Sequence, residues 1–232
     1  MILLNKVINL AEFYENSTAP EVCILVSVDT GEFDAYVSID ELEELAHTAG
    51  AEVFAKLIQK RDRPDNATFL GGGKLWELKN ICDNNEIDLL IFDGELTPSQ
   101  QRNIENFTDV RVIDRTMLIL DIFALNARTS EGKLQVELAQ LKYSLPRLGG
   151  KGAEMSRLGG GIGTRGPGES KLESDRRHIR RRIETLERKL DELSANRELI
   201  RSRRKSDTIS TITHIDTAQA VTSVAYLHIL LE

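Results

Sequence analysis

The stretch from Pro146 to Lys171 combines glycines with basic side chains in a way that suits close contact with a polyanion. It holds nine of the chain's 16 glycines. Glycine lacks a Cβ, so its backbone can approach a partner closely, and so many glycines disfavour a stable helix. Long loops of this kind are usually functional or disordered. The basic residues in the stretch are Arg147, Lys151, Arg157, Arg165 and Lys171.

The densest run of positive charge follows this loop. One explanation is a solvated helix face with acids one turn away, as in the pairs Glu173–Arg177 and Arg180–Glu184. The like charges exceed what the nearby acids neutralise, which favours binding to nucleic-acid phosphates. His178 has no partner for catalysis and is interpreted as another polar contact. The arginines of the run are Arg176, Arg177, Arg180, Arg181 and Arg182.

Charge is divided unevenly along the chain. The formal net charge is −7, yet residues 147–205 carry 17 Lys and Arg against nine Asp and Glu, a net charge of +8. The remainder has 13 basic and 28 acidic residues, a net charge of −15. A basic segment in an acidic chain suggests a polyanion partner. Aromatic residues make up only 5% of the sequence, which argues against a base-stacking platform.

Two glycine motifs bear on nucleotide binding. Residues 161–166 match G-x-G-x-x-G, but a dinucleotide fingerprint requires a preceding strand, and here a helix and a loop precede it. A Walker A motif does not occur in the sequence, so P-loop chemistry has no basis in this chain. A second motif opens a predicted helix, where N–H groups and the helix dipole could hold a phosphate; a flexible turn is the simpler explanation. Its residues are Gly71, Gly72, Gly73 and Lys74.

Nothing in the sequence selects catalytic or metal-binding residues. Asp93, Glu95 and Asp114 follow predicted strands, where helix capping and turn formation explain them best. The two cysteines, Cys23 and Cys82, have no metal-site spacing and lie in apolar runs, so we expect buried thiols in a reducing cytosol. The N-terminus does not resemble a signal peptide, and no apolar run reaches membrane-spanning length.

The elements that carry these segments indicate an α/β domain. Residues 1–20 are expected to form an N-terminal helix or extension. Apolar runs then alternate with helical patterns between residues 21 and 115, which predicts a small parallel sheet with flanking helices. Capping boxes at Ser38–Glu41 and Thr97–Gln100 mark two helix starts. The expected strands are 21–28, 53–58, 88–92 and 110–113.

Residues 116–205 are predicted to form a long antiparallel helical hairpin. Its first helix has leucines at 4-3-4 spacing, from Leu134 to Leu145, and Pro146 ends it. The second continues from Ile179 to Ile200 on a coiled-coil seam of about three heptads. We expect the glycine-rich loop, 146–170, at the tip of the hairpin and the α/β domain at its base. Residues 206–232 form a divergent tail.

Three segments resemble the HflX family of GTPases. They are TFLGGGKLWEL, the stretch from Val112 to Leu148 and, most specifically, MSRLGGGIGTRGPGESKLESDRRHIRRRI. The resemblance covers about residues 20–212. It implies binding to the large ribosomal subunit and its RNA, with the glycine loop near the peptidyl-transferase region, and a role in splitting or rescuing stalled or stressed ribosomes. The RNA contacts that it implies are Arg157, Gly159, Gly160, Gly161, Arg165 and Gly166, together with the arginine run.

The sequence departs from this family after residues 209–212. There the family continues into a strand and a Walker A loop, and this loop binds GTP and Mg. The strand and the loop are absent from this sequence. We therefore expect no cofactor and no GTP hydrolysis in this chain alone. A truncated or frame-disrupted gene product fits this pattern, and so does a partner of a separately encoded GTPase domain. Two rival functions stay open: a nucleotide hydrolase that uses Gly71–Lys74, and a non-functional remnant.

Overall fold

Four parallel strands form the centre of the α/β part of the chain. The computed structural model describes residues 20–148 and 167–206. The sheet order is β2-β1-β3-β4, and every neighbouring pair is parallel. The prediction of an α/β fold is therefore confirmed. The strands are β1 (Val22–Asp29), β2 (Glu52–Lys60), β3 (Leu89–Phe92) and β4 (Arg111–Asp114).

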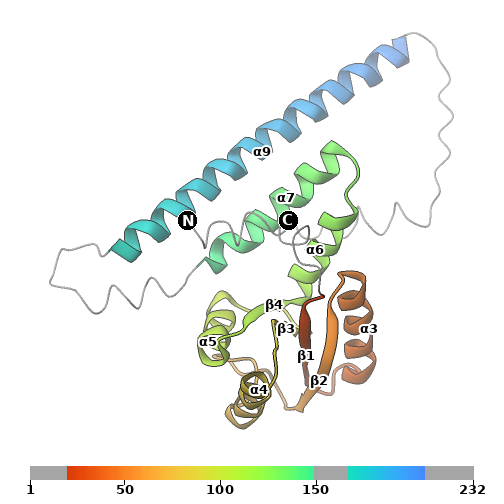
Figure 1. The fold of residues 1–232 in the computed structure, drawn as a ribbon. Helices are drawn as coiled ribbons and strands as arrows, with labels where there is room; N and C mark the ends of the chain where they lie inside the picture. The colour runs from red at the N-terminus through yellow and green to blue at the C-terminus, as the bar shows by residue number, and fades with distance from the viewer. Residues whose placement is uncertain (1–19, 149–166, 207–232) are drawn as a thin grey trace.

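Helices cover both faces of this sheet, as Figure 1 shows. Helices α3 (Ala35–Thr48) and α6 (Arg115–Asn126) pack on one face, and α4 (Gly72–Asn84) and α5 (Pro98–Thr108) pack on the other. Residues 23–28 of β1 are all buried between the two layers. A strand covered on both faces needs apolar residues without alternation, which explains the continuous apolar run in the sequence.

One of the two predicted helix starts is correct. Thr97 and Gln100 form the expected capping box at the start of α5. The box predicted at Ser38–Glu41 is wrong, because α3 begins one turn earlier with Asp34 as its N-cap. The Ser38 hydroxyl instead accepts a hydrogen bond from Arg115, and Glu41 pairs with the same guanidinium. Both residues of the apparent capping box, Ser38 and Glu41, therefore bind Arg115 of α6 and do not cap the helix.

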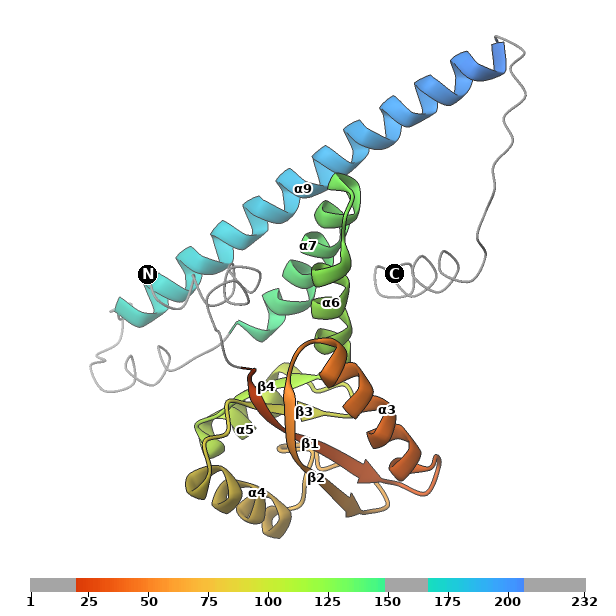
Figure 2. The same ribbon diagram turned by 45° about the vertical axis from the view of Figure 1, so that its right-hand side comes forward.

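Two further helices, α7 (Ser130–Ser144) and α9 (Pro167–Ser206), follow α6, with the short 3-10 helix η1 (Leu145–Arg147) after α7. Helices α7 and α9 lie side by side and run in opposite directions (Figure 2). Ile179, Ile183 and Leu186 of α9 are buried against Leu138 and Leu141 of α7. The segment that joins the helices, 149–166, lies outside the described residues.

Solvent-exposed charge pairs flank the apolar contact between the two helices. Lys142 pairs with Glu187 at 2.9 Å, and Arg182 pairs with Glu137. Arg197 pairs with Glu131, near the start of α7. Beyond that level α9 continues without a partner helix in the described ranges (Figure 1). Across the same ranges, no helix has the length and apolar character needed to span a membrane.

Replacing Leu186 by alanine tests whether this seam holds α7 against α9. Leu186 is fully buried between the helices, so Leu186→Ala is expected to lower the free energy of unfolding by about 2–4 kcal/mol. Leu125→Ala in α6 is the matched control, because Leu125 is 46% exposed, and we expect a loss of at most about 1 kcal/mol. Urea denaturation followed by helical circular dichroism measures both. Equal losses would show that the seam contributes no more than an exposed position.

Candidate nucleic-acid interface

Arg177 and Arg181 are the exposed cations of the arginine run that have no ion-pair partner within residues 20–148 and 167–206. They lie one turn apart on α9, so they share one face of the helix. Both lie in the N-terminal half of α9, 10 and 14 residues after the helix begins at Pro167. Two guanidinium groups held on one helix face, without acids to neutralise them, can bind phosphate groups.

The other arginines of the run are engaged within the protein. Arg182 donates from Nε and Nη2 to the Glu137 carboxylate at 2.7 and 2.9 Å, and these hydrogen bonds raise the pKa of the guanidinium. Arg176 donates to the Leu148 carbonyl at 2.8 Å. Arg180 lies 4.0 Å from Glu173, which the sequence had assigned to Arg177. Arg182 is therefore neutralised by an acid, whereas Arg176 has a donor engaged but keeps its positive charge, and Arg180 has only a long, solvent-exposed ion pair.

Arg147 has a structural position that does not suit RNA binding. Its side chain is only 12% exposed. The guanidinium donates to the carbonyls of Tyr143 and Leu96 at 3.0 and 2.8 Å, and it lies 3.5 Å from the centre of the Tyr143 ring. Asp114 is 3.6 Å away. Because the protein itself occupies this guanidinium, we leave Arg147 out of the proposed RNA surface.

Asp114 joins the α/β domain to α7. Its carboxylate is 2% exposed and accepts hydrogen bonds from the backbone N–H groups of Leu96 and Met117 and from the Tyr143 hydroxyl. Asp114 is thus the N-cap of α6, as the sequence indicated, and also the acceptor that fixes the end of α7. Burial and the Asp114 charge raise the pKa of Tyr143, so the phenol remains a donor.

Asp93 fills the place where parallel α/β sheets commonly bind ligands, beyond the carboxyl ends of the strands. Its side chain is 1% exposed. It accepts hydrogen bonds from Ser27 at 3.2 Å and from Arg115 at 3.0 Å. Glu95, by contrast, is 73% exposed at the edge of the Arg147 contacts. These bonds give Asp93 a structural role.

The glycine turn at the start of α4 is already engaged in part. The Gly71 N–H donates to the Gln59 side chain at 2.8 Å, and Lys74 pairs with Glu77 at 2.9 Å. A side chain at residue 71 would also collide with Arg61, since an added Cβ would lie 2.5 Å from its Nη1. Because this atom is the far end of a flexible side chain and can move aside, packing alone does not require glycine at this position. Phosphate binding by Gly71, Gly72, Gly73 and Lys74 stays a prediction.

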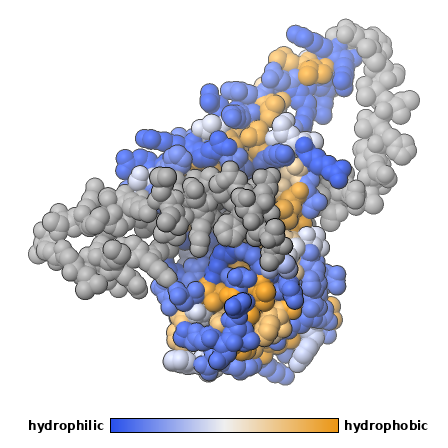
Figure 3. Space-filling view, in the orientation of Figure 1, coloured by the Kyte–Doolittle hydropathy of each residue, from blue (hydrophilic) through white to orange (hydrophobic). Residues whose placement is uncertain are grey.

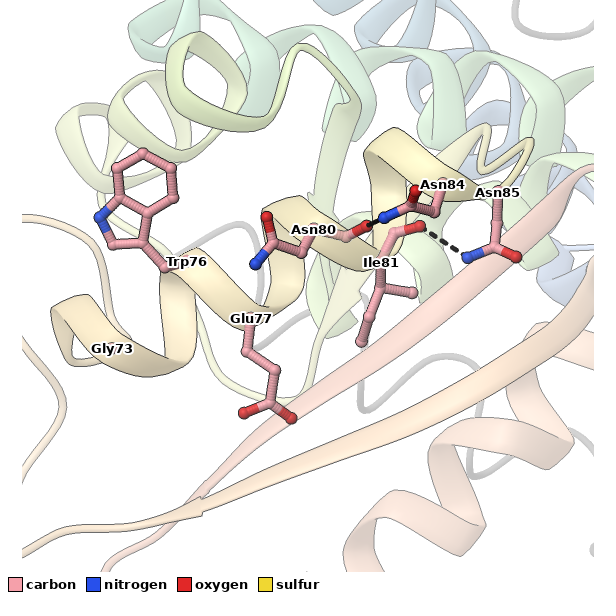
Figure 4. Close-up of a pocket in the computed structure, with 7 residues that line it drawn as sticks. All are labelled: Gly73, Trp76, Glu77, Asn80, Ile81, Asn84 and Asn85. Carbon is pink, nitrogen blue, oxygen red and sulfur yellow. Dashed lines mark hydrogen bonds between the residues drawn. The ribbon is translucent and has the colours of Figure 1, made fainter.

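A shallow depression on α4 lies next to this turn (Figure 4). Trp76 and Glu77 project in different directions there, and the amides of Asn84 and Asn85 bond to carbonyls of their own helix. Ligand pockets usually bring polar groups together around an enclosed apolar cavity. The depression lacks that arrangement. It is lined by Gly73, Trp76, Glu77, Asn80, Ile81, Asn84 and Asn85.

The remaining sequence-predicted contacts lie outside the described residues: Lys151, Arg157, Gly159, Gly160, Gly161, Arg165 and Gly166. Sequence reasoning missed the joint formed by Asp114, Tyr143 and Arg147. Tyr143 is 29 residues from Asp114, and Arg147 is 51 residues from Leu96, so no local pattern could reveal either contact.

Comparison with known protein families identifies the chain. Residues 37–124 match the family model described as GTP-binding GTPase N-terminal, and residues 126–204 match GTP-binding GTPase Middle Region. GTPase HflX of Caldanaerobacter subterraneus subsp. tengcongensis is 55% identical over 192 residues, 83% of this chain and 45% of that protein. GTPase HflX of Escherichia coli is 38% identical over 213 residues, 92% of this chain and 50% of that protein.

The chain belongs to the HflX family. It spans about half the length of the curated HflX relatives that it matches. Solved structures agree with this assignment. A GTP-binding protein from Sulfolobus solfataricus in complex with GDP matches with a TM-score of 0.50 and 27% identity, over 75% of this chain and 46% of that one. SsGBP in complex with GDP matches with a TM-score of 0.55 and 25% identity, over 84% and 48% of the two chains.

Between α6 and α7, this HflX chain buries a further carboxylate that should make its stability depend on pH. Asp121 is 3% exposed and accepts a hydrogen bond from Gln140 at 2.8 Å. Burial raises the pKa of Asp121 to about 7. The folded chain therefore binds this proton more tightly than the unfolded chain. The resulting stabilisation is full below the unfolded pKa of about 4 and is lost as the pH rises to about 7.

Asp121→Asn tests this dependence. Asparagine keeps the oxygen that accepts from Gln140 but does not titrate. We expect the variant to be more stable than the original chain at pH 8, and the difference to shrink or reverse at pH 4. Between pH 4 and pH 8, the difference in the free energy of unfolding between the two proteins should change by at least about 1 kcal/mol. Thermal or urea unfolding across this pH range measures it, and parallel pH profiles for the two proteins would contradict the assignment.

Proposed function

We propose that this chain is a ribosome-docking module that binds RNA of the large subunit. In this proposal α7, α9 and residues 149–166 act as a helical hairpin whose glycine-rich tip approaches the RNA backbone. The family role that the resemblance implies, splitting or rescuing stalled or stressed ribosomes, supplies the biological setting. A GTPase domain, in a longer form or separately encoded, would act on the docked module.

The observation that carries the proposal is the pair Arg177 and Arg181. Both are exposed on one face of α9, in the half of the helix that follows the glycine-rich segment in the sequence, and the described part of the chain offers neither of them an acid. Membership of the HflX family agrees with a nucleic-acid partner for this basic segment. The acidic remainder of the chain would be repelled by RNA, which favours an orientation with the α/β domain held away from it.

The α/β domain supports this role by holding the end of the helical pair from which residues 149–166 continue. Arg147 and Tyr143 anchor the end of α7 to Leu96 and Asp114. On the other side, the hydrogen bond from Arg176 to the Leu148 carbonyl joins α9 to the residue at which the glycine-rich segment begins. This bond ties the last described residue before the segment to α9, nine residues after the helix begins at Pro167.

The salt dependence of binding tests the proposal. Affinity of the labelled chain for purified large subunits is measured at several salt concentrations with Mg held constant. Arg177→Gln together with Arg181→Gln should remove about two phosphate contacts. We expect the slope of log K against log salt to become shallower by about two, and the affinity at low salt to fall roughly tenfold or more.

Arg201→Gln together with Arg204→Gln is the matched control. Both residues are exposed on α9, and the pair removes the same charge farther from the glycine-rich segment. We expect this variant to keep most of the original slope and affinity. If the two double variants weaken binding equally, the attraction is general and the proposed contact is wrong. If neither changes the slope, RNA phosphates are not bound by this face.

A further inference from the structure

The distal part of α9 carries its apolar seam beyond the reach of α7. The seam is buried at Ile179 and Leu186, but Leu193 is 36% exposed and Ile200 is 52% exposed. Leu199, next to the seam, is 57% exposed. Figure 3 shows hydrophobic surface toward this end of the helix. A helix with a charged outer face and an uncovered apolar stripe usually packs against another element.

We propose that residues 207–232 of this chain fold back along α9 and cover the seam at Leu193 and Ile200. In this arrangement the tail buries the apolar seam of the distal part of α9, as α7 buries the seam of the proximal part. The tail has the composition for it, since 13 of its 26 residues are apolar. Its occupancy of the seam would keep the exposed leucine and isoleucine side chains out of water and so limit aggregation.

The spacing of apolar residues in the tail matches the spacing in α7. Ala220, Val224, Leu227 and Leu231 follow one another at intervals of four, three and four residues. The leucines of α7 and η1 that pack on α9 have the same intervals, from Leu134 to Leu145. Apolar residues at these intervals form a single stripe on a helix, which can pack along the seam of a neighbouring helix.

The charges of the two segments are complementary. Between residues 193 and 206, α9 carries five Lys and Arg against a single acid, Glu198. The tail has three acids and no Lys or Arg, so it brings negative charge to a basic helix end. The acids are Asp207, Asp216 and Glu232. Charge complementarity of this kind favours the tail over a second copy of α9, whose own basic residues would be repelled.

The connection is long enough for the chain to reverse direction. Thirteen residues, 207–219, separate the end of α9 from Ala220. An extended segment of that length can span roughly 40 Å. The path from Ser206 back to Leu193 along the helix is about 20 Å, at 1.5 Å per residue. Residues 220–231 can therefore lie beside the exposed seam without strain in the connection.

A photo-crosslinking experiment on the full chain tests this proposal. The photoreactive residue p-benzoylphenylalanine is placed at Ile200 on the seam or, as a matched control, at Glu198, which is exposed about 200° around the helix. After irradiation, peptide mass spectrometry should find crosslinks from residue 200 to residues 220–231. We expect at least fivefold fewer from residue 198. Leu227→Asp with Leu231→Asp should reduce the residue 200 crosslinks by a similar factor.

Three outcomes would overturn the proposal. Crosslinked dimers that increase with protein concentration would show that a second copy covers the seam. Equal crosslinking from residues 198 and 200 would show that the tail has no preferred face of α9. Absence of tail crosslinks from residue 200 would show that the seam stays uncovered in this chain. All three can be read without ribosomes, so the result is independent of the proposed RNA binding.

Discussion

The buried carboxylate of Asp114 is the interaction on which the arrangement of the two parts depends. Asp114 is only 2% exposed, and burying a carboxylate costs free energy unless its oxygens are hydrogen-bonded. Asp114 meets this requirement with donors from three places: the Leu96 backbone after β3, the Met117 backbone in α6 and the Tyr143 hydroxyl at the end of α7. Losing any donor would leave a poorly compensated charge in the joint. The direction of α7, and of α9 packed on it, is therefore fixed relative to the sheet.

Arginine has two roles in this chain, and the structure separates them. Arg147 and Arg182 are held in hydrogen-bonded pairs that organise the joint and the contact between α7 and α9. Arg177 and Arg181 extend from the same basic region with no ion-pair partner in the described ranges. Arg147 and Arg182 are occupied by partners within the protein, whereas the guanidinium groups of Arg177 and Arg181 are available for phosphates. Counting arginines in the sequence therefore overestimates the positive charge that is available to a phosphate-bearing partner.

Much of the fold could be predicted because its signals are local. Continuous apolar runs such as residues 23–28 indicate strands buried on both faces, and the Thr97 capping box places the start of α5 correctly. The box at Ser38 failed because Asp34 caps α3 one turn earlier, and the Ser38 side chain is bound by Arg115, 77 residues away. Ile179, Ile183 and Leu186 of the predicted seam are buried against α7, whereas Ile200 is exposed, because α7 does not extend that far along α9. Such differences come from tertiary contacts, which spacing alone does not encode.

Co-sedimentation of the unmodified chain with purified ribosomal subunits, without nucleotide, tests the central claim most directly. The account predicts that the chain sediments with large subunits at low salt, is released at high salt, and sediments far less with small subunits at equal RNA concentration. Salt sensitivity is expected because phosphate contacts dominate the affinity. Absence of binding to large subunits at low salt, or equal binding to both subunits, would contradict a specific docking function for this chain.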